Sequence, residues 1–239
     1  VRALPRIKPH GLARWHGGAM RRTMLRWAGV GAAVVYGVAV AWGGALWPGY
    51  SHLAQPVSDL IAVGAPSKPA LDPLFAAYNL LTAAFGWGLF LMFRSQPAAP
   101  SARRGRLGAA LLMAEAVAGL LTQAFPEGPG GASARVDLGG ALHIICAATS
   151  SITSLLAVLL LGHALAAQGG RPWFWRYSLL SAVVIVAAGA GAGAGVANGW
   201  AWAGLAERLT IGGFLAWLVV AALGTGPSQA ESESVSTFK

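Results

Sequence analysis

The sequence predicts an all-α integral membrane protein, a bundle of six transmembrane helices with both the N-terminus and the C-terminus in the cytoplasm. Two observations carry this prediction. Of the 239 residues, 56% are hydrophobic and only 10% are charged, whereas a soluble domain carries roughly 25% charged residues. Apolar stretches of about 20 residues also recur along the chain, and a helix of that length crosses a bilayer.

The first apolar stretch, residues 28–47, follows a basic segment and superficially resembles a signal peptide. It is longer than the apolar region of a typical signal peptide, and residues 47–50 (WPGY) offer no small-residue cleavage site, so we interpret it as an uncleaved first span. Five further spans are expected at residues 73–93, 107–125, 139–165, 177–196 and 209–223.

These spans divide the chain into three parts. We expect residues 1–26 to form a basic, disordered cytoplasmic arm, residues 27–223 the six-helix transmembrane domain, and residues 224–239 a disordered cytoplasmic tail, because the two ends lack apolar periodicity. Met20 and Met24 are alternative starts to Val1, since each leaves arginine ahead of the first span. We therefore expect residues 1–19 to be dispensable for insertion.

The distribution of Lys and Arg sets the orientation, because cytoplasmic loops retain these residues and translocated loops lose them. Basic residues gather in the N-terminal segment and in the second-to-third and fourth-to-fifth connections. The opposite side holds only Lys68, Arg135 and Arg208, together with most of the acidic residues. The basic side is therefore predicted to be cytoplasmic, and the membrane to be the plasma membrane. The net charge of +9 lies at helix ends rather than in one patch, which argues against a nucleic-acid partner.

The longest loop, residues 48–72, is expected on the outer side. Within it, residues 56–63 suit a short helix, because Pro56 fits a first helical turn and Gly64 a stop.

The fifth span carries small residues at a spacing that lets helices approach closely, namely Gly189, Gly191, Gly193 and Gly195. We expect this face to pack mainly within the chain, and it also offers a contact for a homodimer. Membrane lipids are the other expected partners.

Polar residues inside the spans are candidates for function, because burying them in a bilayer is costly. On the third span, Glu115 lies near the membrane middle and shares a face with Thr122 and Gln123. On the fourth span, His143 and Ser150 lie on one helical face that should point into the bundle. Glu115 either bonds to hydroxyls such as that of Ser150 as a structural group, or carries a proton or a substrate.

A second group of polar residues should gather at the outer mouth of the bundle. With Glu115 and Ser150, the candidate ligand-binding residues are His52, Ser58, Asp59, Asp137, His143, Glu207 and Arg208. A histidine near carboxylates and a serine suits general-base catalysis, a metal site or a polar cap. We expect no metal and no cofactor. Only His52 and His143 lie outside, without metal-binding spacing, and His143 and His163 are about 30 Å apart along one helix, which excludes shared haem ligation.

Several short motifs follow one another along the chain: PGYSH at 48–52, SDL at 58–60, GAP at 64–66, FPEGPGG at 125–131, then His143, and GLAERL at 204–209. In this order the sequence resembles the bacterial membrane family called domain of unknown function 998, over residues 27–223. The resemblance implies a multi-pass membrane fold and no settled activity. Its motifs contain Ser58, Asp59, His143, Glu207 and Arg208, which favours the outer mouth as the site.

Three functions remain open from the sequence. The first is a non-enzymatic protein that binds a lipid headgroup or small solute at the outer mouth, for transport, sensing or assembly. The second is an intramembrane lipid hydrolase with His143 as base or ligand, Asp59 as its partner and Ser58 as nucleophile or water-positioning group. The third is a purely structural bundle. A contact of about 3 Å from His143 to Asp59 or Ser58 would favour the hydrolase.

Overall fold

The computed structural model describes residues 10–97, 99–133 and 138–225, with the side chains of residues 10–22 and 133 left out. The described part is all-helical. Its six long helices are α1 (His10–Leu46), α2 (Lys68–Arg94), α3 (Ala102–Ala124), α4 (Leu138–Gly169), α5 (Pro172–Asn198) and α6 (Ala203–Gly224). Two short 3-10 helices, η1 (Ser58–Ile61) and η2 (Gly131–Ser133), lie in the connections. All six long helices are long and apolar enough to cross a membrane, so the predicted fold class is confirmed.

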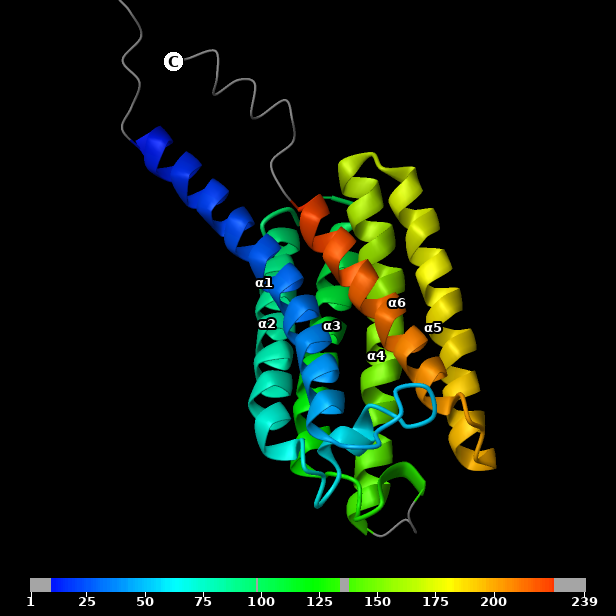
Figure 1. Cartoon of the computed structure of the whole chain (residues 1–239). Helices are drawn as coiled ribbons and strands as arrows, with labels where there is room; N and C mark the ends of the chain where they lie inside the picture. The colour runs from blue at the N-terminus through cyan, green and yellow to red at the C-terminus, as the bar shows by residue number, and fades with distance from the viewer. Residues whose placement is uncertain (1–9, 98, 134–137, 226–239) are drawn as a thin grey trace, which may run out of the picture.

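The helices pack in chain order around a ring. Each helix contacts the next, and α6 returns to pack against α1 and closes the bundle. The first and last described residues lie at one end, which we call the terminal end (Figure 1). The other end carries η1, η2 and the connections around them, and we call it the loop end.

Helix α1 differs from the sequence-based expectation for the arm. It begins at His10, so residues 10–26 are helical rather than disordered, and this part of α1 projects beyond the other helices (Figure 1). The physical reason is local, because no proline interrupts residues 10–46 and Ala, Leu, Met and Arg favour helix there. Residues 1–9 of the arm and 226–239 of the tail lie outside the described residues.

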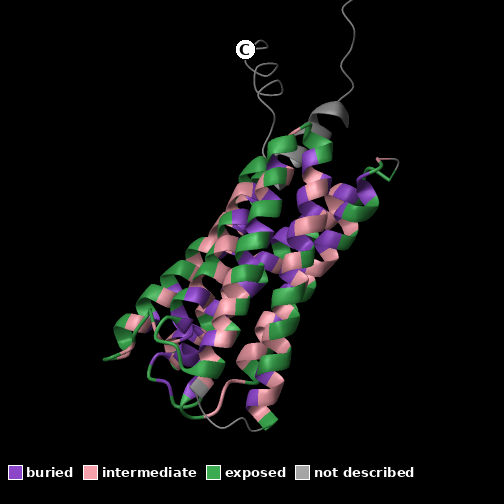
Figure 2. Cartoon of the chain, turned by 90° about the vertical axis from the view of Figure 1, so that its right-hand side faces the viewer, coloured by how far each residue is buried: buried purple, intermediate pink, exposed green. Residues whose placement is uncertain are grey.

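The outer surface of the bundle is apolar. Figure 2 shows that exposed residues follow the outward faces of the helices while buried residues line the inside. The exposed set includes large apolar side chains such as Val34 and Val38 on α1 and Leu180 and Val183 on α5. An apolar surface of this kind would be unfavourable in water, whereas it is well solvated by the lipid chains of a membrane. The chain is a multi-pass membrane protein.

The glycines of α5 serve mainly to pack that helix against α6. A Cβ added at Gly195 would meet Ala203, and one at Gly189 would touch Thr210. A Cβ at Gly193 would meet nothing within 4 Å, so this position faces outward. The homodimer contact through α5 stays a prediction.

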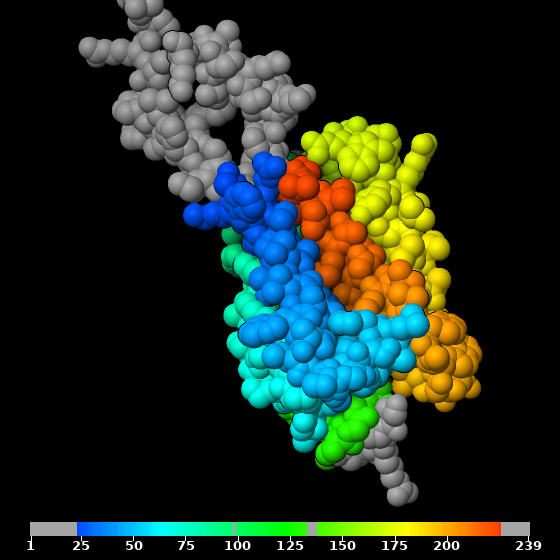
Figure 3. Space-filling model, viewed as in Figure 1, coloured from blue at the N-terminus to red at the C-terminus, as the bar shows by residue number. Residues whose placement is uncertain are grey.

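The interior of the bundle differs between its two ends. Toward the terminal end it is filled by fully buried side chains that include Phe85, Leu112, Leu161 and Trp217. The indole Nε1 of Trp217 donates to the Ser178 hydroxyl at 2.9 Å, which satisfies its polar atom. At the loop end a smaller apolar cluster includes Leu60 of η1. Residues 50–66, which contain η1, cover this end of the bundle, and we call them the cap. Figure 3 shows the segment around η1 lying across the lower ends of α1 and α6.

Candidate functional site

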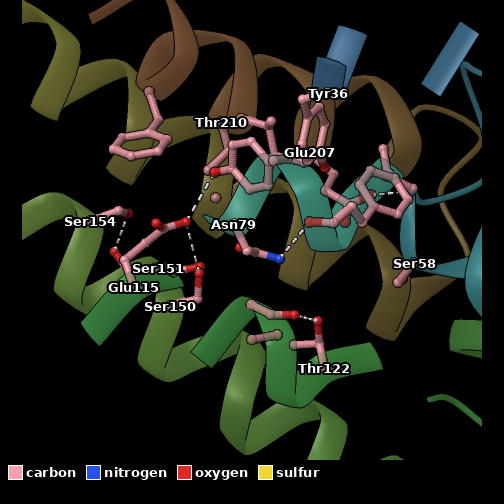
Figure 4. Close-up of a pocket in the computed structure, with 18 of the residues that line it drawn as sticks. Tyr36, Ser58, Asn79, Glu115, Thr122, Ser150, Ser151, Ser154, Glu207 and Thr210 are labelled. Carbon is pink, nitrogen blue, oxygen red and sulfur yellow. Dashed lines mark hydrogen bonds between the residues drawn. The ribbon is translucent and has the colours of Figure 1, made fainter. Parts of the chain in front are cut away.

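A cavity of about 270 Å³, lined by both apolar and polar side chains, lies between the packed terminal half and the cap. Side chains from all six helices and from η1 line it. On α2, α4 and α6, most of the lining residues come earlier in the helix than the core residues. All three helices start at the loop end, so the cavity occupies the loop half of the bundle. Figure 4 shows its polar groups converging from opposite helices, among them Tyr36, Ser58, Asn79, Glu115, Ser150 and Glu207.

Glu115 of α3 points into this cavity, and only 3% of its surface is exposed. The Tyr78 hydroxyl donates to its Oε1 at 3.0 Å, and the Ser150 hydroxyl lies 3.5 Å from the same oxygen. The predicted contact with Ser150 is therefore present, although long. The other oxygen, Oε2, has no hydrogen-bond partner among the described residues. One oxygen of a deeply buried carboxyl group is thus available to accept a hydrogen bond from a further donor.

Asn79 of α2 lies beside Glu115 and is 2% exposed. Its Nδ2 donates to the Phe75 carbonyl at 2.9 Å, while its Oδ1 has no partner within the described part of the chain. The amide packs against Gly119, where a Cβ would overlap it, so glycine is needed for this close approach. Gln123, two turns along α3 from Glu115, also lines the cavity, and its buried Nε2 is unpartnered there.

The sequence did not single out Tyr36, Tyr78 and Asn79. Helical periodicity shows which side of α1 or α2 is inward, but not that these side chains meet Glu115. An asparagine and two tyrosines inside apolar spans were the available signal, because such polar groups are costly in a bilayer.

His143 of α4 lines the cavity near the loop end and is 4% exposed. Its Nδ1 lies 3.0 Å from the carbonyl oxygen of Phe125 and 3.2 Å from that of Thr122, so this nitrogen carries the hydrogen and donates. Its Nε2 lies 3.7 Å from Glu127 Oε1. The carboxylate beside the ring is therefore Glu127 and not the Asp59 of the hydrolase hypothesis, because the α3–α4 connection brings Glu127 there.

Asp59 links the α1–α2 connection to the α3–α4 connection. Its Oδ1 accepts a hydrogen bond from the Ala132 backbone N–H at 2.9 Å. Val63 N–H donates to the Glu127 carbonyl at 2.9 Å, which adds a second link between the same segments. Burial raises the pKa of Asp59, and the hydrogen bond from Ala132 opposes this rise. Asp59 is therefore a structural residue of the cap.

Glu127 lies beside Asp59 and His143 at the loop end. Burial, with a smaller contribution from the negative charge of Asp59, raises the pKa of Glu127 from 4.5 to about 7, against the opposing effect of a hydrogen bond from Ser58. A carboxyl group of this kind exchanges its proton near neutral pH. It lies outside the residues that line the cavity.

Glu207 and Arg208 at the start of α6 anchor the cap from two sides. The Val57 backbone N–H donates to Glu207 Oε2 at 2.5 Å. The Arg208 guanidinium donates to the Gln55 carbonyl at 2.8 Å and to the Tyr50 hydroxyl at 2.5 Å. Glu207 also lines the cavity, whereas Arg208 does not.

The remaining candidates lie elsewhere. His52 is exposed, with its ring against Gly44 of α1 and 5.1 Å from the ring of Tyr50, and partial burial lowers its pKa. Asp137 lies outside the described residues. The structure therefore brings Ser58, Glu115, His143, Ser150 and Glu207 to one cavity and leaves out His52, Asp59 and Arg208.

Comparison with known proteins supports the resemblance seen in the motifs. The model of the family described as "Protein of unknown function (DUF998)" matches residues 28–224. No curated protein and no solved structure matches the chain. The matched range includes most of the membrane-spanning part of α1 and all of α2 to α6. The chain belongs to the DUF998 family.

Proposed function

We propose that this protein binds a small solute or a lipid headgroup in the cavity, from the loop end of the bundle. The observation that carries the proposal is the set of unpartnered polar atoms on the cavity wall: Glu115 Oε2, Asn79 Oδ1 and Gln123 Nε2. Buried polar atoms are nearly always hydrogen-bonded, because burying one without a partner costs free energy. A ligand with complementary groups would supply the missing hydrogen bonds.

The position of the cavity supports binding from one side. The terminal half of the bundle is closed by tightly packed residues such as Phe85 and Trp217. Toward the side, Ser151 of α4 is exposed and also lines the cavity, opposite the small residues Gly189 and Ala192 of α5. A ligand therefore has a route past the cap or laterally from lipid, and none through the packed half in this conformation.

A cavity-filling variant tests this function. Ala147 of α4 lines the cavity, whereas its neighbour Ala148 is exposed on the same helix. We expect Ala147→Phe to expel a bound molecule and Ala148→Phe to leave it in place, because the first variant adds a ring inside the cavity and the second adds the same ring on the exposed surface. Native mass spectrometry of protein released from membranes would detect the bound mass. The same bound mass in all three proteins, or none in the wild type, would contradict the proposal.

The geometry gives less support to the alternative, a lipid hydrolase. A general base for Ser58 requires a free histidine nitrogen directed at its hydroxyl. In this site Nδ1 of His143 bonds to backbone carbonyls and Nε2 faces Glu127, while Ser58 hydrogen-bonds Glu127. Lipid turnover by the purified protein that Ser58→Ala abolishes would favour the hydrolase over binding alone.

We also propose that the terminal end is cytoplasmic, in the bacterial plasma membrane. Arg94, Arg103 and Arg171 lie at helix ends near the terminal end, while Asp59 and Glu127 lie at the loop end. This distribution agrees with the rule that cytoplasmic loops retain positive charge. The cavity would then face the outside of the cell.

A further inference from the structure

The chemistry of the cavity wall indicates which ligand it would accept. From that wall we propose that the ligand carries a primary ammonium group, which binds between Glu115 and Asn79. This inference rests on the proposed function and specifies its ligand. The ammonium belongs either to a free amine or to a lipid headgroup, and the experiment below separates the two sources.

The first argument is the match of donors to acceptors. The two unpartnered atoms in the deep part of the cavity, Glu115 Oε2 and Asn79 Oδ1, are both acceptors in this arrangement, because Asn79 Nδ2 is bonded to the Phe75 carbonyl. Asn79 Oδ1 packs against Gly119, four residues along α3 from Glu115, so the two acceptors lie about one helical turn apart along α3. A primary ammonium has three N–H donors and can serve both.

The second argument is charge. Glu115 and Glu207 both line the cavity, and no lysine or arginine does so among the described residues. An ionised carboxylate in the membrane interior is costly unless a cation pairs with it. A ligand cation would satisfy that requirement, whereas an anion would be repelled. The described residues contain no group of three His, Cys, Asp or Glu side chains suited to a metal ion, which favours an organic cation.

The third argument is the aromatic wall. The rings of Tyr36, Phe75 and Tyr78 line the cavity next to the two acceptors. Tyr36 packs against Phe75 with ring centroids 5.1 Å apart and edge-on against Tyr78 at 4.9 Å. Such rings attract ammonium groups through cation–π interaction and receive the alkyl part of an amine. Carboxylate, amide oxygen and aromatic rings therefore select the same ligand class.

A charge series of probes tests the inference in the full-length protein. In nanodiscs of phosphatidylglycerol, which has no amine, we would measure the rise in unfolding temperature with butylamine, butan-1-ol, butyrate and butyltrimethylammonium. We expect the largest rise with butylamine, because only it combines positive charge with N–H donors. Glu115→Gln should weaken butylamine binding about tenfold or more, since it removes a charge-assisted hydrogen bond. It keeps an acceptor for the Tyr78 hydroxyl, so the fold should survive.

A second cavity variant, a control variant outside the cavity and a lipid-binding measurement complete the test. Asn79→Leu removes the second acceptor at similar size and should also weaken butylamine binding. Asp72→Asn removes one negative charge at the start of α2, where Asp72 pairs with Lys68 at 3.0 Å, and should leave binding unchanged. The lipid source is tested by native mass spectrometry from nanodiscs of mixed phosphatidylethanolamine and phosphatidylglycerol. Selective retention of phosphatidylethanolamine, lost in Glu115→Gln, would identify the ammonium as a lipid headgroup.

The outcomes separate this inference from the proposed function. If butylamine alone stabilises the wild type, or if phosphatidylethanolamine alone is retained, and Glu115→Gln removes the effect, the inference stands with its source identified. If butan-1-ol or butyrate binds as well as butylamine and Ala147→Phe blocks both, the cavity binds a solute but not through an ammonium, and the inference fails. If no probe and no lipid binds, the proposed function fails with it.

Discussion

Loss of the Arg208 guanidinium should loosen the cap over the cavity. Arg208 donates to the Gln55 carbonyl and to the Tyr50 hydroxyl, and these are bonds between α6 and the segment before η1. A hydrogen bond from a charged group contributes about 1.5–3 kcal/mol, so the lower value for each of these half-exposed bonds gives about 3 kcal/mol. Arg208→Met keeps the apolar stem and removes both bonds. Opening of the cap should therefore become about 100-fold more frequent.

A buried cysteine would report this opening. Ser67 is fully buried, and its hydroxyl donates to the Leu60 carbonyl of η1 at 2.7 Å, so a cysteine at this position is covered by the cap. In a Cys146→Ser background, the rate at which Ser67→Cys reacts with a thiol reagent measures the open fraction when reclosing is fast. We expect Arg208→Met to raise this rate about 100-fold.

The terminal end supplies a matched control. Arg171 donates to the Gly224 carbonyl at 3.0 Å, which is also a bond from an arginine to a helix-end carbonyl. Arg171→Met should leave the labelling of Ser67→Cys unchanged, because it acts at the far end of the bundle. Equal rates in wild type and Arg208→Met would show that the guanidinium does not hold the cap, and would refute the reasoning.

Two further predictions concern pH and orientation. Because burial raises the pKa of Glu127 from 4.5 to about 7, the folded protein keeps this proton where the unfolded chain loses it, and stability should fall as pH rises through this window. Glu127→Gln should reduce this loss of stability, so the unfolding temperature at about pH 8 should come closer to that at about pH 5. Asp59, whose pKa is also raised, leaves a smaller loss of the same sign. An unchanged dependence of stability on pH in Glu127→Gln would contradict the role given to Glu127. In a cysteine-free background, an impermeant thiol reagent should label Val63→Cys in intact cells and Ser95→Cys only after permeabilisation, since both positions are exposed at opposite ends. Labelling of Ser95→Cys in intact cells would reverse the proposed orientation.

Some features of the site followed from local sequence pattern. The inward stripe of His143 and Ser150 was predicted because residues at helical spacing share a face, and both line the cavity. The short helix in the long loop was predicted from Pro56 and Gly64, and η1 with a positive φ of 83° at Gly64 agrees with it. These predictions succeeded because each depends on residues within a few turns of one another.

The pairing of residues from different helices did not follow from the sequence. Glu127 rather than Asp59 lies beside His143, because the path of the α3–α4 connection decides which carboxylate reaches the ring. Tyr78 reaches Glu115 from α2 for the same kind of reason. Periodicity gives the face of a helix but not its height or rotation relative to a neighbour.

By itself, the sequence determined that the chain crosses a membrane six times, where each span lies and which side is basic, because the bilayer sets the length and polarity of each span independently of its neighbours. Only the tertiary structure decided that the terminal half packs solidly around Trp217 while the loop half encloses a cavity around Glu115. The difference between the halves arises from how side chains of six helices fill the space between them. Filling depends on distances between helices, which composition and periodicity do not contain.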